Sequence, residues 1–312
     1  MTHAWKQTIE INESIASQVI ANQHNIQIDS IKTLDAGWDN VVCLVNQNLI
    51  FRFPRREPGL ECMENEVTLV PYIQDHVSFA LSAPKWIGTP SALYPYLYAG
   101  YPMLAGKPLS DTNAELIDDI QFAKTLASWL RELHQVPVTQ KHIDAVKGGY
   151  EWKVNVKQRT ARCEENLGRY KNDFIAAGLN TKILQEVIQQ LKQWHLEFKS
   201  TAFVHGDLYS RHIMIDEETC QPSGVIDWGD VHIGHPGVDL SAGMIFTPEL
   251  FQTFLSHYGR VDDETYRILL FNSFCHSMSF LPYAFEQKRK GLMDWATIVL
   301  NRAIDEINSS FK

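Results

Sequence analysis

The chain has few of the features that mark secreted, membrane-bound or disulfide-stabilised proteins. Its 312 residues include only five cysteines, an odd number with no C-x-x-C pair, so we expect neither a disulfide framework nor a zinc–thiolate site. No stretch approaches the roughly 18 apolar residues that a membrane helix needs. The N-terminal residues lead into a polar segment and not into the apolar core of a signal peptide. These absences predict a cytoplasmic protein with reduced thiols and no membrane partner.

An excess of basic residues is also missing. Lys and Arg number 28 against 37 Asp and Glu, which leaves a formal net charge of −9. Nucleic acids and anionic membranes need a basic face, so neither is expected as a partner. An acidic chain permits a cationic small-molecule substrate, and we expect a monomer or a weak dimer that binds a small molecule.

The chain divides into a strand-rich first third and a helix-rich remainder. Alternating apolar residues predict strands at 31–34, 41–45 and 49–53, and an extended run at 93–97. Helical spacing predicts helices over 7–24, 60–75, 113–134 and 182–198. Two glycines and two prolines between residues 99 and 108 mark a linker. We therefore expect an α+β fold with an N-terminal lobe over 1–101, a C-terminal lobe over 102–312 and a hinge near 99–105.

One segment, residues 201–240, interrupts the helical pattern and carries polar side chains at strand ends. His205-Gly206-Asp207 follows one apolar run, and Asp227 follows another after a turn. Two short strands in a hairpin, each with an aspartate at its end, would hold two carboxylates close together. Hard oxygen ligands in such an arrangement suit a divalent metal and a phosphate substrate.

The spacing within this segment follows the protein-kinase pattern H-R-D-x-x-x-x-N with a later D-F-G. Here Asp207 takes the place of the catalytic aspartate, His212 that of the asparagine, and Asp227 that of the D-F-G aspartate. The chain is similar to the aminoglycoside phosphotransferase superfamily, whose signature is H-G-D-x-x-x-x-N followed by I-D. The resemblance implies a bilobal, protein-kinase-like fold and extends over nearly the whole chain.

The resemblance implies roles for the residues of this segment. Asp207 resembles the base that orients the acceptor hydroxyl and takes its proton, and Asp227 resembles the magnesium-binding carboxylate. His212 stands where the family commonly has a metal-binding asparagine, although imidazole is not the first choice of Mg²⁺. In this respect the chain resembles the 2″-aminoglycoside and macrolide phosphotransferases, which also carry histidine at this position. His212 is therefore expected at the metal, at a phosphate or against Asp207.

The first lobe is implied to bind the nucleotide, ATP or GTP. Gly37, in Gly37-Trp38-Asp39-Asn40, resembles the loop that positions the nucleotide, and a plain turn is the alternative. The hinge residues Pro102, Met103 and Leu104 resemble the segment whose backbone contacts the purine.

The lysine that kinases carry on the third strand is replaced in this chain by Arg52, in Ile50-Phe51-Arg52-Phe53-Pro54. Glu66 lies fourteen residues further along, in a predicted helix, where it could form an ion pair with Arg52. An ordinary surface pair is the alternative interpretation. Alternation along the strand places Arg52 away from the side of Phe51 and Phe53, which favours it as the cation that meets the nucleotide.

The resemblance implies transfer of the γ-phosphate to a hydroxyl of an antibiotic, and we expect an aminoglycoside ahead of a macrolide. Acids after residue 230 favour a polycationic aminoglycoside, whereas the aromatic residues between 271 and 295 suit a macrolide, and small alcohols of the choline or homoserine type are a third class. Two readings outside kinase activity also remain. One is a transition-metal hydrolase that uses the histidines near Asp207, and the other is a pseudokinase that binds nucleotide without transfer.

Overall fold

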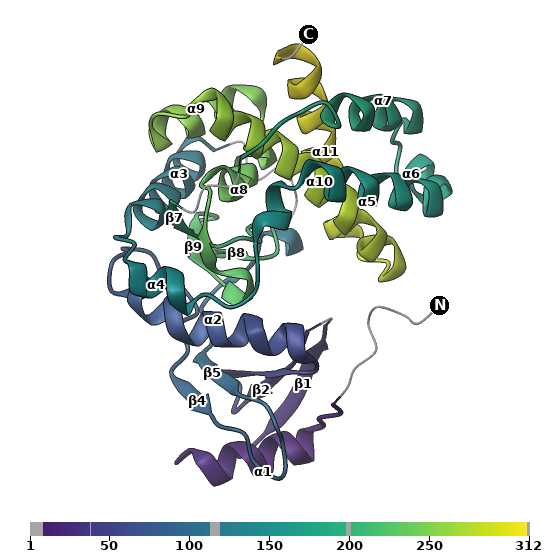
Figure 1. The fold of residues 1–312 in the computed structure, drawn as a ribbon. Coiled ribbons are helices and arrows are strands. Elements are labelled where there is room, and N and C mark those ends of the chain that lie inside the picture. Colours follow the sequence, from purple (N-terminus) through teal and green to yellow (C-terminus); the bar gives the residue numbers. More distant parts are fainter. Residues whose placement is uncertain (1–8, 38, 113–118, 198–200, 311–312) are drawn as a thin grey trace. The chain divides into compact units, whose positions relative to one another are not determined.

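The computed structural model describes residues 9–37, 39–112, 119–197 and 201–310. Strands gather in the first third of the chain and helices dominate the rest (Figure 1), which confirms the expected α+β fold class. The chain forms two compact units. The first contains residues up to Ala105, Thr139–Gly148 and Gly224–His232, and the second contains Gly106–Val138, Gly149–Ser223 and Ile233–Lys312.

The first unit is built on an antiparallel sheet in the order β1-β2-β3-β5-β4. Its strands are β1 (Ile31–Ala36), β2 (Asn40–Val45), β3 (Leu49–Pro54), β4 (Trp86–Gly88) and β5 (Tyr98–Pro102). Its helices are α1 (Glu13–Gln23), α2 (Glu57–Gln74), α4 (Gln140–Ala145) and the short 3₁₀ turn η4 (Trp228–Asp230). The predicted strands at 31–34, 41–45 and 49–53 and the helix at 60–75 are confirmed.

A tight turn joins β2 to β3. The loop has three residues, of which Asn46 and Gln47 have positive φ values, of 49° and 62°, and the Asn48 N–H donates to the Val45 carbonyl at 3.3 Å. Register follows from this turn, because Val45 pairs with Leu49 and Val42 with Arg52.

The two faces of this sheet have different partners (Figure 1). On one face Phe51 and Phe53 are fully buried with α1 residues, and the ring of Phe53 stacks on that of Tyr98 with centroids 4.8 Å apart. On the other face Ile50 packs with Met63 of α2. Because side chains alternate along a strand, Arg52 shares the α2 side with Ile50, as predicted.

Residues 93–97 do not form the expected extended run, since β5 begins at Tyr98. The segment turns instead, with the Ser91 N–H donating to the Tyr94 carbonyl at 2.8 Å. This turn carries the Tyr94 ring into the core against Phe53, and burial of that ring outweighs continued strand pairing.

The second unit is mostly helical. Its helices and 3₁₀ turns are η1 (Leu109–Asp111), α3 (Ile120–Gln135), η3 (Glu151–Val154), α5 (Val156–Arg169), α6 (Lys171–Ala176), α7 (Thr181–Leu191), α8 (Gly237–Leu240), η5 (Ser241–Ile245), α9 (Pro248–Tyr258), α10 (Asp263–Glu286) and α11 (Lys290–Ser310). Its short strands are β6 (Lys107–Pro108), β7 (Ala202–Val204) and β8 (Ile213–Ile215). The chain passes from one unit to the other within β9 (Pro222–Val225) and within β10 (His232–Gly234).

Helices in this unit begin where the sequence offers capping side chains. The Asp119 carboxylate accepts hydrogen bonds from the Gln121 and Phe122 N–H groups at the start of α3. Asp262 accepts from the Thr265 N–H at the start of α10, whose central turns are buried on nearly every side. Residues 113–118 and 198–200, at the edges of two predicted helices, lie outside the described residues.

The sequence predicted that Asp207 and Asp227 each follow a strand of one hairpin, and this prediction is wrong about which strands pair. β8 and β9 are neighbours, but β7, the strand before Asp207, pairs with β10 in a separate two-stranded sheet. The aspartate that follows β8 directly is Asp216, whose carboxylate accepts from the Thr219 N–H at 2.8 Å and closes the β8–β9 turn. Local apolar runs do not specify which strands pair, because pairing depends on long-range packing.

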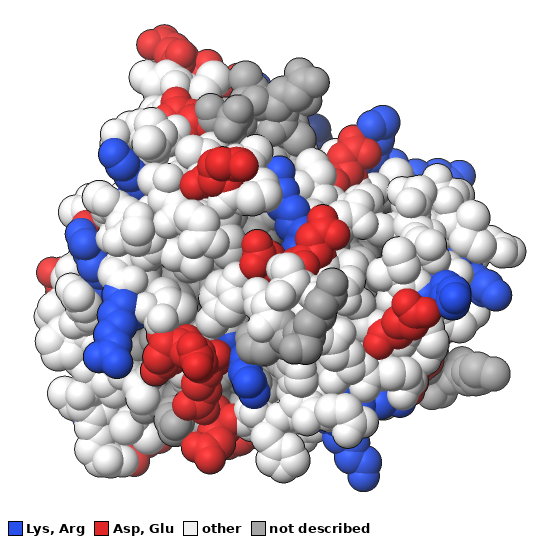
Figure 2. Space-filling view, turned by 90° about the horizontal axis from the view of Figure 1, so that it is seen from above, with Lys and Arg blue, Asp and Glu red and all other residues white. Residues whose placement is uncertain are grey.

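No helix within the described ranges is long and apolar enough to cross a membrane. Figure 2 shows acidic and basic side chains interspersed among uncharged ones over the face that it displays.

Candidate active site

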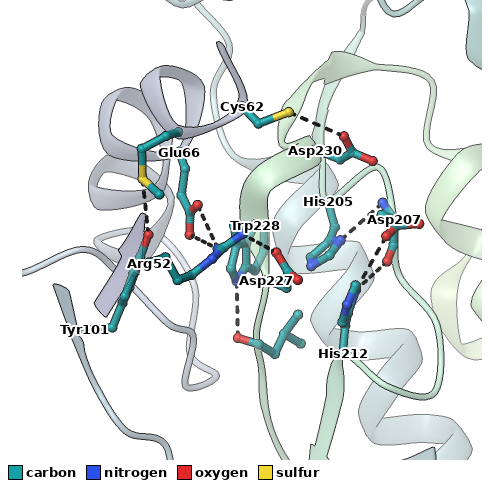
Figure 3. A network of polar contacts seen from close by, with 12 residues as sticks. Arg52, Cys62, Glu66, Tyr101, His205, Asp207, His212, Asp227, Trp228 and Asp230 are labelled. Atoms are coloured by element: carbon teal, nitrogen blue, oxygen red, sulfur yellow. Dashed lines mark hydrogen bonds and ion pairs between the residues drawn. The ribbon is translucent and has the colours of Figure 1, made fainter. Parts of the chain in front are cut away.

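A buried ion-pair network joins strand β3, helix α2 and the segment after β9 in the first unit (Figure 3). Arg52 Nη1 donates to both carboxylate oxygens of Glu66, at 3.0 and 2.9 Å. Arg52 Nη2 donates to Asp227 Oδ1 at 2.6 Å. Glu66 is fully buried, whereas the Asp227 side chain is 44% exposed. One guanidinium therefore holds two carboxylates, and only Asp227 is open to solvent.

The charges of this network do not balance. Burial raises the pKa of Glu66 to about 7, although the Arg52 guanidinium opposes this increase. Burial alone would lower the pKa of Arg52, but the charges of Asp227 and Glu66 raise it above its ordinary value. A single cation shared between two acids cannot fully offset the desolvation of both.

The backbone at Asp227 is in the left-handed region, with φ 62° and ψ 66°. Only a few per cent of non-glycine residues adopt this conformation, and it costs on the order of 1 kcal/mol or more. The next residue, Trp228, is fully buried, and its indole N–H donates to the Val225 carbonyl at 3.2 Å. The buried indole thus stabilises the backbone turn at Asp227, and this turn directs the Asp227 carboxylate towards Arg52.

The predicted nucleotide loop between β1 and β2 is stabilised by two arginines. Arg55 Nη1 donates to the Gly37 carbonyl at 2.9 Å, and Arg56 forms an ion pair with Asp39 at 2.6 Å. A Cβ atom built at Gly37 would meet nothing closer than 3.8 Å, so space alone does not require glycine there. Trp38 lies outside the described residues.

The predicted hinge has one of its donors already occupied. The Met103 N–H donates to the Asn48 carbonyl at 2.9 Å, and Pro102 pairs with Leu49 at the end of β5. Pro102 and Met103 are exposed and Leu104 is half-buried. A purine that used the Met103 N–H would have to displace the Asn48 carbonyl.

In the second unit, the loop after β7 is anchored by Asp239 of α8. The buried Asp239 carboxylate accepts from the His205 N–H at 2.7 Å and from the Gly206 N–H at 2.9 Å. The His134 ring nitrogen Nε2 lies 3.2 Å from the same carboxylate. Lys153 holds the loop from its other side, because Nζ donates to the Gly206 carbonyl at 2.9 Å. The loop conformation includes Gly206 at φ 84°, where a side chain would be strained.

Asp207 is held by a histidine that the sequence motif does not contain. His276 Nε2, from the middle of α10, donates to Asp207 Oδ1 at 2.9 Å. Burial alone would raise the pKa of Asp207, but the hydrogen bond from His276 and the charges of His276, His212 and Lys153 lower it well below its usual range. The carboxylate is therefore ionised at neutral pH, as a group that orients a hydroxyl and accepts its proton must be.

His212 is also tied to Asp207, but through the main chain (Figure 3). Its Nδ1 donates to the Asp207 carbonyl at 2.8 Å, whereas the Asp207 carboxylate lies 3.8 Å away. When the ring is neutral, donation from Nδ1 makes Nε2 the unprotonated nitrogen, which is the form of histidine that ligates metals.

The donor set can be tested against magnesium. No group of three or more His, Cys, Asp or Glu side chains in the described part of the chain is arranged to hold a metal ion, which disfavours the transition-metal hydrolase. Magnesium at a nucleotide, however, takes only one or two carboxylates and fills its remaining positions with phosphates and water. The exposed carboxylate of Asp227 fits that requirement.

A narrow pocket of about 30 Å³, here named the His276 pocket, lies beside the Asp207 side chain in the second unit. Leu208, Tyr209, Phe280 and Trp295 are among its walls, together with His276 itself. The ring of His276 stacks on that of Phe280 and lies against that of Tyr209. Apart from His276, which is bonded to Asp207, none of its described lining residues carries a carboxylate, ammonium or guanidinium group.

A second cavity, here named the arginine cavity, adjoins the first at Leu292 and has a volume of about 590 Å³. Ser110, Thr112, Arg211 and Arg289 are among its walls. A cavity of this size can hold a small molecule.

The acids on which the aminoglycoside expectation rests lie elsewhere among the described residues. Neither cavity is lined by any of Asp230, Asp239, Glu249, Asp262, Asp263, Glu264, Glu286 and Asp294. Asp239 anchors the loop, Asp262 caps α10 and Asp294 pairs with Lys290 at 2.6 Å. Of the aromatic residues in the same region, Phe271 and Phe274 are core, whereas Phe280 and Trp295 line the His276 pocket.

Three residues of this site were missed by sequence reasoning. His276 lies 69 residues after Asp207, on a different element, so no local spacing connects them. Lys153 likewise acts through the backbone of a distant loop. Asp239 did carry a signal, because it follows His235-Pro236-Gly237 closely after the motif, but it was grouped with acids for the substrate.

Comparisons with known proteins agree with this arrangement. The family profile described as Phosphotransferase enzyme family matches residues 30–270. No curated protein matches the chain. Among solved structures, the GDP and kanamycin complex of APH(2″)-IIIa is 20% identical and covers 95% of this chain and 99% of its own, with a TM-score of 0.67.

Two further structures are similar. The macrolide 2′-phosphotransferase MphH from Brachybacterium faecium, an apoenzyme, is 20% identical over 91% of this chain and 98% of its own, with a TM-score of 0.56. The streptomycin–ATP complex of APH(2″)-IIa is 16% identical over 94% of this chain and 100% of its own, with a TM-score of 0.56. These similarities show that the fold is the kinase-like fold of antibiotic phosphotransferases. The matched profile covers more than half of the sequence, and this chain therefore belongs to the phosphotransferase enzyme family.

Proposed function

We propose that the protein transfers the γ-phosphate of ATP or GTP to a hydroxyl of a small-molecule acceptor, with Asp207 as the catalytic base. The observation that carries this proposal is the Asp207 carboxylate, which His276 keeps ionised at the edge of the His276 pocket. The fold and the family are those of phosphotransferases.

The reaction balances without a covalent enzyme intermediate. The acceptor oxygen forms a bond to the γ-phosphorus as the bond from that phosphorus to the bridging oxygen breaks, and the nucleoside diphosphate leaves. The hydroxyl proton passes to Asp207. Because His276 takes one oxygen of the carboxylate, the other oxygen is left to receive the acceptor hydroxyl.

The first unit supplies the nucleotide site in this proposal. Arg52, positioned by the buried Glu66, would meet the phosphates, Gly37 would lie under them, and the backbone at Pro102, Met103 and Leu104 would meet the purine. Asp227 and His212 would hold Mg²⁺, which when bound neutralises charge on the transferring phosphoryl group. Similar structures contain GDP or ATP.

For the acceptor, a sugar hydroxyl of an antibiotic remains the first class to test, since similar structures include a kanamycin complex and macrolide phosphotransferases. The described walls of the His276 pocket include aromatic side chains and no carboxylate, so they offer no counter-charge to the amines of an aminoglycoside. An aminoglycoside would need carboxylates at several of its amines.

The test is magnesium-dependent release of nucleoside diphosphate from ATP and GTP against a panel of aminoglycosides, macrolides and small alcohols. Asp207→Asn should lower kcat by about 10²- to 10⁴-fold with nucleotide affinity kept, as expected for loss of a general base. Asp227→Asn should instead weaken metal–nucleotide binding.

Asp216→Asn is the matched control, because Asp216 is an aspartate of the same segment that only closes the β8–β9 turn. Nucleotide binding without turnover on any acceptor would indicate a pseudokinase. Full activity of Asp207→Asn would refute the assignment of the base.

A further inference from the structure

The arginine cavity has a charge opposite to that of the chain as a whole. Two guanidinium groups, of Arg211 and Arg289, and one carboxylate, of Asp111, belong to residues that line it. The formal net charge of the protein is −9, so a net positive cavity is not a consequence of average composition. The hydroxyl-bearing residues Ser110 and Thr112 add polar groups to the same walls.

The cavity is built by close packing of the first turn of α11 against η1. A Cβ atom at Gly291 would lie 2.5 Å from the Ser110 carbonyl oxygen, so only glycine lets the helix approach this turn. The Ser110 N–H donates to the Ser210 carbonyl at 3.0 Å, which ties η1 to the loop that carries Asp207. The cavity and the catalytic loop therefore share one rigid frame within the second unit.

Asp111, the one acid among the described lining residues of the cavity, accepts a hydrogen bond from its own neighbour. The Ser110 hydroxyl donates to Asp111 Oδ1 at 3.3 Å. The Thr112 hydroxyl donates to the Leu109 carbonyl at 2.6 Å, so both hydroxyls are held in place. Arginine presents planar pairs of N–H donors that match carboxylate and phosphate oxygens, which makes the two guanidinium groups the main recognition elements here.

We propose that the arginine cavity is the acceptor subsite for an anionic group, a carboxylate or a phosphate or sulfate ester, carried by the molecule whose hydroxyl Asp207 activates. This inference rests on the proposed transfer to a hydroxyl at Asp207. Leu292 lines both cavities, and in this proposal the acceptor extends from Asp207 past Leu292 and places its anion between Arg211 and Arg289. A polycationic acceptor would meet two like charges and one carboxylate, which disfavours it.

The first experiment measures binding alone, with inorganic phosphate as the probe. Calorimetric titration is done at constant ionic strength and saturating GDP, so that the nucleotide occupies its own phosphate subsite. We expect Arg211→Gln and Arg289→Gln each to weaken phosphate binding about 10- to 100-fold, the range for a lost charge-assisted hydrogen bond.

Asp111→Asn should tighten phosphate binding, because it removes the only carboxylate among the described residues of the cavity. Arg131→Gln is the matched control, since Arg131 lies on α3, bonds to the His257 carbonyl and lines neither cavity. Arg289 is exposed, so Arg289→Gln decides the question even if Arg211→Gln does not fold. Equal phosphate affinity in wild type and Arg289→Gln would overturn the proposal.

The second experiment measures turnover on matched pairs of hydroxy compounds that differ only in charge, glycerate against glyceramide and glycerol 3-phosphate against glycerol, beside kanamycin and a macrolide. We expect the anionic member of a pair to have at least a tenfold higher kcat/KM, and Arg289→Gln to remove that advantage with nucleotide KM unchanged. Preference for the carboxylate pair or the phosphate pair identifies the anion. Efficient turnover of kanamycin in both wild type and Arg289→Gln would refute the subsite.

The two experiments separate failure of the subsite from failure of the proposed function. Phosphate binding that depends on Arg289, with no turnover of any acceptor, would support the subsite and count against transfer to these hydroxyls. Turnover that is indifferent to Arg289 would support the transferase and reject the anionic acceptor.

Discussion

The two polar networks of this protein shift the pKa of a buried carboxylate in opposite directions. In the first unit one guanidinium, Arg52, serves two acids, and burial dominates, so the pKa of Glu66 is raised. In the second unit the buried Asp239 has two backbone N–H donors and His134 around one carboxylate, and its pKa is lowered although burial alone would raise it. Hydrogen bonds and opposite charge therefore outweigh burial at Asp239, whereas at Glu66, whose cation is shared with Asp227, they do not.

The largest effect is expected in the Asp239 network, where His205, Gly206 and His134 surround one carboxylate. Asp239→Ala leaves the His205 and Gly206 N–H groups and His134 without their shared acceptor, and breaking such a buried network costs about 3–5 kcal/mol. Chemical unfolding of the variant measures the free energy of unfolding. Asp262→Ala is the control, because loss of an N-cap at α10 costs only about 1 kcal/mol. Similar losses in the two variants would mean that the network adds nothing beyond a cap.

The next prediction concerns pH and should separate the two networks by sign. Between pH 4.5 and about 7 the folded protein holds a proton on Glu66 that the unfolded chain has lost, so this group lowers stability as pH rises through that window. The lowered pKa of Asp239 does the reverse, since its stabilising contribution is present above the unfolded value near 3.8 and is lost in acid.

Unfolding midpoints of wild type and Glu66→Gln from pH 4.5 to 7.5 measure this contribution. We expect the difference between them to change by on the order of 1–3 kcal/mol across the window, in favour of the variant at the alkaline end. A constant difference at all pH values would show that Arg52 keeps Glu66 ionised throughout and that both networks behave alike.

A smaller effect is expected at His276, where ring packing and hydrogen bonding can be separated. His276→Phe keeps a ring against Phe280 and Tyr209 but loses the donor to Asp207, and His276→Gln keeps an N–H donor but loses the ring. If donation orients the base, His276→Phe should lower kcat about tenfold with nucleotide KM unchanged, whereas His276→Gln should retain more of it. The opposite ranking would assign His276 to packing.

The smallest effect is expected at Gly229, beside the network in which Arg52 binds Glu66 and Asp227. A Cβ atom there would lie 3.3 Å from Arg52 Nη2, a contact that the flexible guanidinium can relieve by a shift of a few tenths of an ångström. Gly229→Ala should therefore weaken nucleotide binding only about two- to fivefold, corresponding to less than about 1 kcal/mol. Gly168→Ala, with nothing within 4 Å of the new Cβ, is the matched control for titration of a fluorescent nucleotide. Loss of binding beyond tenfold would show that Arg52 has no freedom to move.

Sequence reasoning was strongest where the physical signal is local. Alternation along residues 49–53 correctly separated Arg52 from Phe51 and Phe53, and helical spacing placed Glu66 where it meets the guanidinium. The motif spacing by itself indicated the family, and the roles of the motif residues remain predictions.

What could not be predicted depends on contacts between distant elements. The pairing of β7 with β10, the donor at His276 and the support from Lys153 each join segments with no sequence relation to one another. The hydrogen bond from the Met103 N–H to the Asn48 carbonyl could not be predicted for the same reason. Counting acids along the sequence did not distinguish Asp262, which caps a helix, and Asp239, which anchors a loop, from acids that face a ligand.

The anchoring of the catalytic loop by Asp239 has a consequence for how this protein can change over evolutionary time. Two of the three bonds that it receives come from main-chain N–H groups, which every residue except proline carries. Substitutions among the neighbouring pocket residues, such as Leu208 and Tyr209, therefore leave this anchor intact. If the proposed function holds, a lineage can exchange the pocket walls while the loop that carries Asp207 keeps its shape, so single mutations give access to new acceptors.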